Sequence, residues 1–251
     1  MGKIIAVVNQ KGGVGKTTTA VNLTAALTEA GKRVLLCDFD PQANATSGLG
    51  LDKRHLRHSV YDVIVNDVPA KDAIVQTKFG DVLPSTADLA GAGVELVTMD
   101  SPNYRLKNAL DTVKDRYDLI FIDCPPSLEL LTLNSLCAAD GIMVPVQCDY
   151  YALEGLTDLM TTLRMVKTRL NPRLEIFGVA LTMFDGRTNF SPQVAQEVRR
   201  HFPGKVYATA IPRNVRLAEA PSHGLPVSAY DKSSRGAQAY KAMAAEIIEK
   251  L

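Results

Sequence analysis

The sequence predicts an α/β fold in which a mostly parallel sheet is covered by helices on both faces. Short strands that are apolar along their whole length alternate with helical segments, which is typical of a parallel sheet buried on both sides. A glycine-rich loop follows the first strand, and aspartates follow two others. Because parallel sheets bind ligands at the carboxyl ends of their strands, these residues are expected to gather at one site.

The expected elements alternate through most of the chain. The expected strands cover residues 4–8, 34–37, 119–122, 142–146, 174–182 and 206–211, and the expected helices cover residues 17–30, 101–116, 127–138, 151–169 and 190–202. The first helix is expected to stop at Gly31, because glycine readily adopts the left-handed conformation that closes a helix. Residues 43–100 are the least readable part. There, residues 44–50 are expected to form a loop, after which a few short helices or a strand could follow. Residues 89–93 contain too much glycine to predict a helix.

The composition is that of a single globular domain over residues 1–251. Hydrophobic residues make up 46% and charged residues 22% of the chain, which is ordinary for a soluble protein. No apolar run reaches the length of a membrane span, and the strand near the N-terminus leaves no room for a signal peptide. The four cysteines form no C-x-x-C pair and lie mostly in apolar runs, which indicates free buried thiols in a reducing cytoplasm.

Charge is distributed unevenly along the chain. Residues 1–159 carry 14 Lys and Arg against 20 Asp and Glu, whereas residues 160–251 carry 14 against 7. Such an asymmetry predicts a basic face that could meet a polyanion, although an ordinary solvated surface explains the count equally well.

Residues 11–18, with the sequence KGGVGKTT, join the first strand to the first helix. A glycine loop followed by Lys-Thr at a helix start is the sequence form of a phosphate-binding P-loop. Its backbone N–H groups and the helix dipole face one point. Lys16 is expected to reach the β- and γ-phosphates, and the Thr17 hydroxyl to bind Mg²⁺. The expected nucleotide-binding residues of this loop are Lys11, Gly12, Gly13, Val14, Gly15, Lys16, Thr17 and Thr18.

Aspartates supply the expected metal-binding and catalytic groups. Asp123 follows four apolar residues, which is the Walker B arrangement, and can hold Mg²⁺ directly or through water beside Thr17. Capping of the next helix is the structural alternative for Asp123. Asp38 and Asp40 share a strand end, and phosphoryl transfer to water needs a group that orients the attacking water. A purely structural role for both of these carboxylates is the alternative.

The pattern K-G-G-x-G-K-T-T, with Lys11 before the first glycine, resembles the ParA/MinD class of P-loop ATPases. The similarity extends over nearly the whole chain and is strongest to ParA/Soj-type chromosome and plasmid partition ATPases. The stretches that carry it are residues 38–42, 44–47, 145–147, 150–155, 211–214, 219–222 and 234–236.

The resemblance implies roles for individual residues. Lys11 would reach the phosphates of a partner subunit, so that Lys11, Lys16 and Asp40 form the catalytic set. Asp40, the aspartate before Pro41, would orient the attacking water. Asp38 would belong to the metal site as an outer ligand or would hold the loop.

Other residues match family positions outside the motifs. Pro212 and Asn214 would lie near the adenine, and Glu154 near the nucleotide or the subunit boundary. Arg187 and Arg216 match positions that contact DNA in the family.

The resemblance also implies an activity and partners. ATP and Mg²⁺ would close two subunits into a homodimer over two nucleotides, and this dimer would bind DNA without sequence preference. A ParB-type partner, through its basic N-terminal segment, would stimulate ATP hydrolysis and release. The expected location is the nucleoid in the bacterial cytoplasm. No helix-turn-helix extension precedes the P-loop, so sequence-specific operator binding is not expected.

Two alternatives belong to the same P-loop class. A MinD-like ATPase that cycles on membranes would need a terminal amphipathic helix with a basic face. Residues 240–251 are apolar at helical spacing, but their polar face mixes lysine with glutamate, which suits packing on the core. An iron–sulfur protein would need two thiolates from each subunit, and no second cysteine lies between Asp38 and Asp123 to accompany Cys124.

Overall fold

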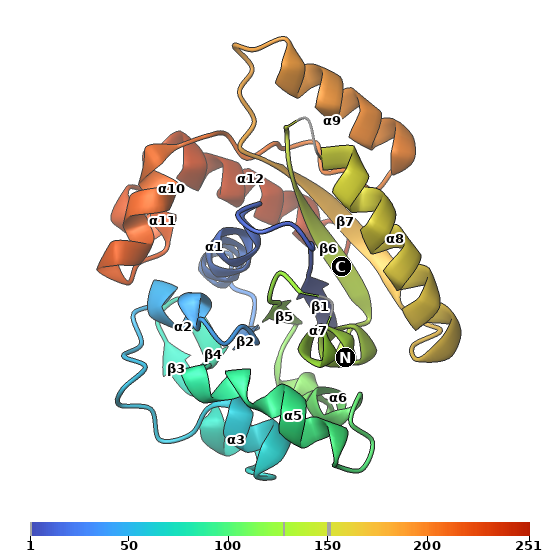
Figure 1. The fold of residues 1–251 in the computed structure, drawn as a ribbon. Coiled ribbons are helices and arrows are strands. Elements are labelled where there is room, and N and C mark those ends of the chain that lie inside the picture. The colour runs from blue at the N-terminus through green and yellow to red at the C-terminus, as the bar shows by residue number, and fades with distance from the viewer. Residues whose placement is uncertain (1, 128, 150–151) are drawn as a thin grey trace.

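A seven-stranded sheet runs through the centre of the molecule, with helices on both of its faces (Figure 1). The computed structural model describes residues 2–127, 129–149 and 152–251, without the side chains of residues 152–155. In spatial order the strands are β3 (Val75–Thr77), β4 (Gly80–Leu83), β2 (Val34–Asp38), β5 (Leu119–Asp123), β1 (Lys3–Val7), β6 (Gly141–Gln147) and β7 (Glu175–Thr182). All neighbouring strands are parallel except β3 and β4. The predicted fold class is confirmed.

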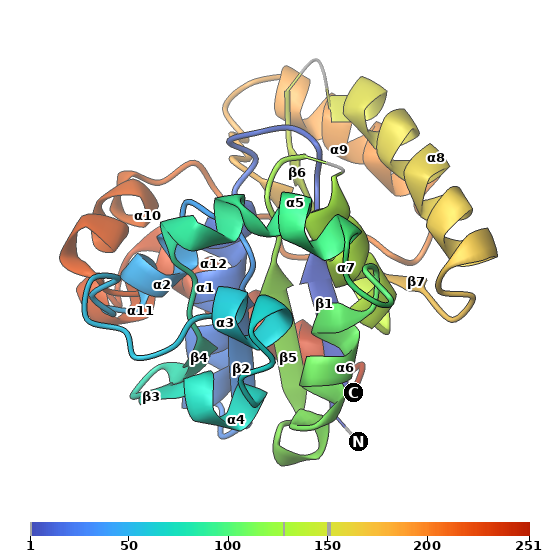
Figure 2. The ribbon, with the colours of Figure 1, turned by 60° about the horizontal axis from the view of Figure 1, so that its bottom comes forward.

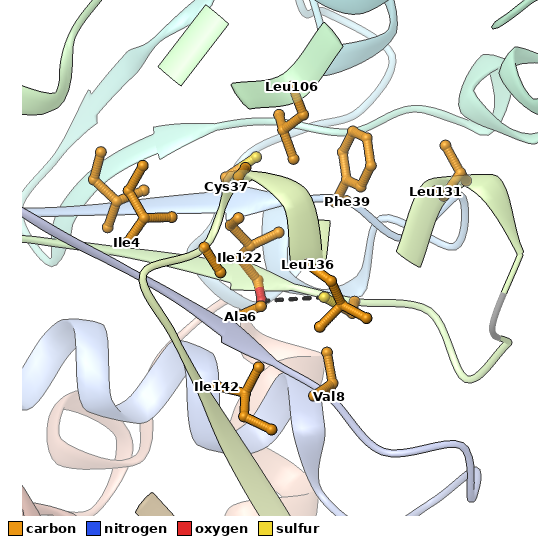
Figure 3. Close-up of a cluster of buried hydrophobic side chains, with 14 of the residues drawn as sticks. Ile4, Ala6, Val8, Cys37, Phe39, Leu106, Ile122, Leu131, Leu136 and Ile142 are labelled. Carbon is orange, nitrogen blue, oxygen red and sulfur yellow. Dashed lines mark hydrogen bonds between the residues drawn. The ribbon is translucent and has the colours of Figure 1, made fainter. Parts of the chain in front are cut away.

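Successive side chains of each strand point to opposite faces of the sheet, and each face has its own core. On β1, Ile4 and Ala6 join one buried cluster, whereas Ile5 and Val7 join the other. Figure 3 shows the first cluster, in which strand residues pack against leucines of the covering helices. The helices on this face are α3 (Val60–Val65), α4 (Ala70–Ala73), α5 (Ala92–Val97), α6 (Arg105–Asp111), α7 (Leu130–Ala138), α8 (Ala152–Arg169) and α9 (Phe190–His201).

The opposite face carries the helix that follows the P-loop. Figure 2 shows α3 and α6 in front of the sheet, with α1 and α12 behind it. The helices on this second face are α1 (Lys16–Glu29), α2 (Asn44–Gly48), α10 (Val215–Glu219), α11 (Val227–Tyr230) and α12 (Arg235–Ile248). Gly31 has a φ of 82° just after α1, as predicted for the end of that helix.

The C-terminal helix packs on the core, as its pattern predicted. Tyr240, Met243, Ala244 and Ile247 of α12 are buried against α1 and the sheet. The Tyr240 hydroxyl lies 3.1 Å from that of Thr19 in α1. None of the helices in the described part of the chain is both long and apolar enough to span a membrane.

The least readable segment contains more helix than predicted. Residues 44–50 were predicted to be a loop, but Asn44–Gly48 form α2. The backbone N–H of Thr46, in the first turn of α2, donates to the carboxylate of Asp38 at the end of β2. This distant carboxylate satisfies a helix-end donor that local sequence leaves unpaired. Residues 89–93 lie where a short 3₁₀ helix (Ala87–Ala90) meets α5 at Gly91.

Two other predicted elements were wrong in extent or kind. The helix predicted over 101–116 divides into α6 and a short 3₁₀ helix (Lys114–Arg116). The strand predicted over 206–211 is reduced to an isolated bridge between Val206 and Val179 of β7. The N–H groups of Ala208 and Thr209 donate instead to the carboxylate of Glu246 in α12, at 2.8 Å each. Tyr207 and Ile211 still donate to β7, but Thr209, which lies between them, donates to Glu246, so the ladder is interrupted there.

Candidate nucleotide-binding and hydrolysis site

The glycine loop between β1 and α1 is shaped by two left-handed residues. Gly13 has a φ of 74° and Gly15 a φ of 89°, a region that favours glycine. Gly15 is the N-cap of α1, and no side chain caps the first N–H groups of that helix. A helix start with uncapped N–H groups binds anions readily. A Cβ placed on Gly12 would meet nothing within 4 Å, so its own chain does not require a glycine there.

Lys16 lies inside this loop rather than in solvent. The residue is only 7% exposed, and its Nζ donates to the backbone carbonyl of Lys11 at 3.2 Å. Burial lowers the pKa of Lys16, and the charges of Asp123 and Asp40 act in the opposite direction. The ammonium group is thus fixed at the mouth of the loop and shares its pocket with carboxylates.

Strand register brings Asp38 and Asp123 together. The two residues pair across β2 and β5, and both are fully buried. Neither carboxylate oxygen of Asp123 makes a hydrogen bond with any described residue. Burial and the neighbouring Asp38 raise the pKa of Asp123; the Thr17 hydroxyl is close enough to oppose this, but not in hydrogen-bonding geometry. A buried carboxylate without a partner is costly, and a divalent cation beside Thr17 would satisfy it. The residues therefore fit Mg²⁺.

Asp38 differs from Asp123 because its oxygens already have donors. Oδ2 accepts from the N–H and the hydroxyl of Thr46, both at 2.7 Å, and Oδ1 accepts from the N–H of Asp40 at 3.3 Å. Burial raises the pKa of Asp38 to about 6, although the bonds from Thr46 oppose that rise. This geometry matches the loop-holding role considered for Asp38.

Asp40 is half-buried at the edge of the same pocket. Its Oδ1 accepts from the N–H of Gln42 at 2.9 Å, and its carbonyl accepts from the Ser85 hydroxyl at 2.9 Å. Its Oδ2 makes no hydrogen bond with a described residue. One carboxylate oxygen is thus fixed by the protein, and the other is available to accept from water.

Contacts from β6 and β7 hold the loop in place. The Thr182 hydroxyl, at the end of β7, donates to the carbonyl of Val14 at 2.8 Å. The Asn9 side chain donates to the carbonyl of Pro145 in β6 at 2.8 Å and accepts from the N–H of Lys11. The ammonium group of Lys11 forms an ion pair with Asp149, which follows β6.

A cavity of about 410 Å³ opens beside the start of α1. Pro212 and Asn214 lie on its wall, together with Met183 and Tyr240. Asn214 also caps α10, since its side chain accepts from the N–H of Arg216 at 2.9 Å. Gly15, the N-cap of α1, and Thr18 in the first turn of that helix line the same cavity, so the cavity adjoins the uncapped start of α1.

Comparison with known proteins agrees with this geometry. A family profile described as AAA domain matches residues 2–176. The sporulation initiation inhibitor protein Soj of Bacillus subtilis is 58% identical over 249 residues, 98% of each chain. The chromosome partitioning protein ParA of Caulobacter vibrioides is 51% identical over 252 residues, 99% of this chain and 94% of that protein.

The chain belongs to the ParA/Soj family of chromosome-partitioning ATPases. A solved structure with another name shares the fold. The cobyrinic acid a,c-diamide synthase of Mycobacterium smegmatis, with bound ADP and magnesium, superposes with a TM-score of 0.87 at 39% identity. That alignment covers 99% of this chain and 95% of the other.

The residues that the ParA/Soj resemblance assigns to DNA are not part of the cavity lining, which contains neither Arg187 nor Arg216. The Arg187 side chain is 88% exposed and pairs with Asp185 at 2.7 Å. Arg216 is 46% exposed and pairs with Glu219 at 2.8 Å and with Asp231 at 3.3 Å. Both predicted DNA contacts are therefore engaged by neighbouring carboxylates.

Some site residues were missed by reasoning from the sequence, and one prediction falls outside the described part. Asp149 follows an apolar strand just as Asp123 does, so the same signal could have found it. Thr46 and Ser85 lie in the segment that the sequence left unassigned, and no motif marks them. The backbone of Glu154 belongs to α8, but its side chain lies outside the described residues.

Proposed function

We propose that this ParA/Soj-family chain is a single-domain ATP hydrolase for DNA segregation. Its ATP-bound homodimer binds DNA without sequence preference, and a ParB-type partner stimulates hydrolysis and release. The observation that carries the proposal is the combination of a buried Lys16 and an unpartnered, buried Asp123 at the mouth of the glycine loop. Such a cation and carboxylate together suit a nucleotide phosphate group with its metal.

Binding of ATP uses the β1–α1 side of the site. The uncapped N–H groups at the start of α1 and the Lys16 ammonium meet the phosphates. Thr17 and Asp123 would hold Mg²⁺, which would supply positive charge to offset that of the phosphates. The base occupies the 410 Å³ cavity beside Pro212 and Asn214.

Hydrolysis uses the β2 side of the site. Asp40 has one carboxylate oxygen without a donor among the described residues, and its negative charge acts on the Lys16 ammonium by raising the pKa of that lysine. The free oxygen would accept a hydrogen bond from the attacking water and so orient that water toward the γ-phosphate. Asp38 holds the loop that carries Asp40.

Dimerisation is supported by Lys11 and Gly12. Gly12 is exposed and open, so a glycine there suits close approach of a second loop rather than packing within the chain. Lys11 leaves Asp149 in the closed dimer and reaches the phosphates bound by the partner subunit. Closing two subunits joins their basic C-terminal regions into one DNA-binding surface.

The membrane-cycling alternative has less support. The apolar face of α12 is buried in the core, so insertion into a bilayer would require this helix to leave α1 and the sheet. Sedimentation with anionic liposomes and ATP tests this alternative directly. The chain is expected to stay in the supernatant, and ATP-dependent pelleting would favour a MinD-like cycle.

Asp40→Ala separates binding from turnover and tests the proposed function. This variant should bind ATP and Mg²⁺ with near wild-type affinity in calorimetry, and should release phosphate at least about 100-fold more slowly. With ATP its mass by light scattering should double, because the closed dimer is not resolved by hydrolysis. Wild-type turnover in this variant, or loss of ATP binding, would contradict the role given to Asp40.

A further inference from the structure

Two buried hydroxyl groups connect Asp40 to the interior of the protein. The Thr46 hydroxyl donates to Asp38 Oδ2 at 2.7 Å and accepts from the N–H of Ser85 at 2.9 Å. The Ser85 hydroxyl donates to the backbone carbonyl of Asp40 at 2.9 Å. Thr46, Ser85 and Asp38 are all fully buried. The chain of bonds therefore runs from the end of β2 through α2 and the loop after β4, and returns to Asp40.

This network holds the backbone on both sides of Asp40. The N–H of Asp40 donates to Asp38 Oδ1 at 3.3 Å, and its carbonyl accepts from Ser85. The only hydrogen bond to its carboxylate from a described residue comes from the N–H of Gln42, two residues away. The Asp40 carbonyl also accepts from the N–H of Ala43 at 2.8 Å, but that bond lies within the turn that follows β2. The bonds that tie Asp40 to the sheet and to the loop after β4 therefore come from Asp38 and Ser85.

The position of the Asp40 carboxylate matters because the water that it orients must attack in line with the γ-phosphate. A displacement of about 1 Å in a positioned group can cost two orders of magnitude in rate. By contrast, the groups that bind ATP lie on the β1–α1 side, and neither Thr46 nor Ser85 makes a hydrogen bond with Gly15, Lys16 or Thr17.

We propose that Thr46 and Ser85 are positioning residues for ATP hydrolysis, and that they act by fixing the place of Asp40. The proposal rests on the proposed role of Asp40 in orienting water. Loss of either hydroxyl should lower kcat and leave the affinity for ATP nearly unchanged, since only the hydrolysis step uses the exact place of Asp40.

The test compares turnover and ATP affinity in Ser85→Ala, Thr46→Val and Thr46→Ser. The first two should lower kcat at least about tenfold and change the Kd for ATP by less than about threefold. Thr46→Ser keeps the hydroxyl and should recover most of the rate. Thr24→Val is the matched control, because Thr24 is also fully buried and donates to a backbone carbonyl (Ala20, 2.8 Å), but in α1 away from Asp40. Its kcat should stay close to the wild-type value.

Combination with Asp40→Ala shows whether the hydroxyls act through Asp40. Ser85→Ala should add no further loss of rate when Asp40 is already alanine, because residues that act as a unit are not additive. A further loss in that background would overturn the proposal, as would a fall in ATP affinity equal to the fall in kcat. If Thr46→Val does not fold, Ser85→Ala decides alone, since it removes only a hydroxyl.

The same variants distinguish failure of the role proposed for Asp40 from failure of the positioning role proposed for Thr46 and Ser85. Wild-type turnover in Asp40→Ala would refute the role of Asp40, and with it the positioning role. A slow Asp40→Ala together with wild-type turnover in Ser85→Ala would refute only the positioning role.

Discussion

The nucleotide site and the C-terminal basic region differ in how their charged groups are satisfied. In the nucleotide site, Lys16 and Asp123 are buried, and the oxygens of Asp123 have no donor among the described residues. In the basic region, Arg187 and Arg216 are exposed, and each is already paired with a carboxylate. The nucleotide site thus contains a carboxylate that lacks a donor from the described residues, whereas the arginines of the basic region are neutralised by neighbouring carboxylates.

This difference explains why the two regions should differ in affinity and selectivity. Folding has already removed most water from Lys16 and Asp123. Binding of a phosphate and a metal therefore does not have to supply the free energy of removing that water. In the proposed function, DNA would instead compete with Asp185, Glu219 and Asp231 for arginines that also face water. A count of 14 basic against 7 acidic residues in this third therefore overstates the positive charge available to one DNA backbone.

The largest expected effect is on the nucleotide site itself. Lys16→Ala removes the cation at the mouth of the loop and should weaken ATP binding at least about 100-fold, measured by calorimetry. Lys114→Ala is the matched control, because Lys114 is also largely buried and pairs with a carboxylate, that of Asp140. ATP affinity that survives in Lys16→Ala would remove the phosphate-binding role of the loop.

The next effect concerns the link between the two regions. Gly12→Val adds a side chain where the chain itself leaves open space, so folding and ATP affinity should change little. A second loop that approaches this point would clash, and ATP-dependent dimerisation should weaken at least about tenfold. Light scattering of Gly12→Val in the Asp40→Ala background provides the measurement. A normal ATP-dependent dimer would show that the loops do not meet at Gly12.

Buried carboxylates predict a pH dependence that exposed ion pairs cannot produce. Burial raises the pKa of Asp38 to about 6 and also raises that of Asp123, whereas an unfolded aspartate titrates near pH 4. Between about pH 4 and 6, the folded protein therefore binds more protons than the unfolded chain, so its free energy of unfolding falls as the pH rises through that range.

Urea denaturation of the nucleotide-free protein should show this dependence. The protein should be more stable at about pH 5 than at pH 7, by on the order of 1–2 kcal/mol. Asp38→Asn should reduce the difference, because it removes one of the two raised groups. Stability that increases from pH 5 to pH 7 would contradict the buried charge pair.

The smallest expected effect is on the basic region. Asp185→Asn removes the carboxylate that pairs with Arg187 and should strengthen DNA binding by the ATP-bound dimer roughly threefold at low salt. Asp52→Asn is a close control, because Asp52 pairs with Arg54 through the same spacing and the same backbone contact, outside the basic third. Filter binding with random duplexes gives both affinities. Equal changes in the two variants would mean that Arg187 has no special role.

The sequence predicted where the glycine loop and the strand-end aspartates lie far better than it predicted the pairing of charges on the surface. The P-loop and the strand-end aspartates could be found because short-range pattern fixes them: an apolar strand followed by a polar residue predicts where that residue lies. Parallel register then placed Asp38 beside Asp123.

Other features depend on contacts between distant segments. Thr46 and Ser85 are 39 positions apart, and the first turn of α2 is capped by the carboxylate of Asp38, which accepts from the N–H of Thr46, so local pattern could not reveal either contact. Glu246 likewise withdraws two backbone donors from the strand expected over 206–211. The pairing of Arg187 and Arg216 with acids was equally invisible to a count of charges.

DNA binding by two ATP-bound variants tests most directly whether the nucleotide site controls the basic region. Asp40→Ala and the double variant Asp40→Ala/Gly12→Val should both bind ATP, but only the first should dimerise. With ATP, the single variant is expected to retain random duplex DNA on a filter with a steep dependence on salt, and the double variant is expected to retain almost none. Equal DNA binding by the two variants would contradict control of DNA binding through the closed dimer.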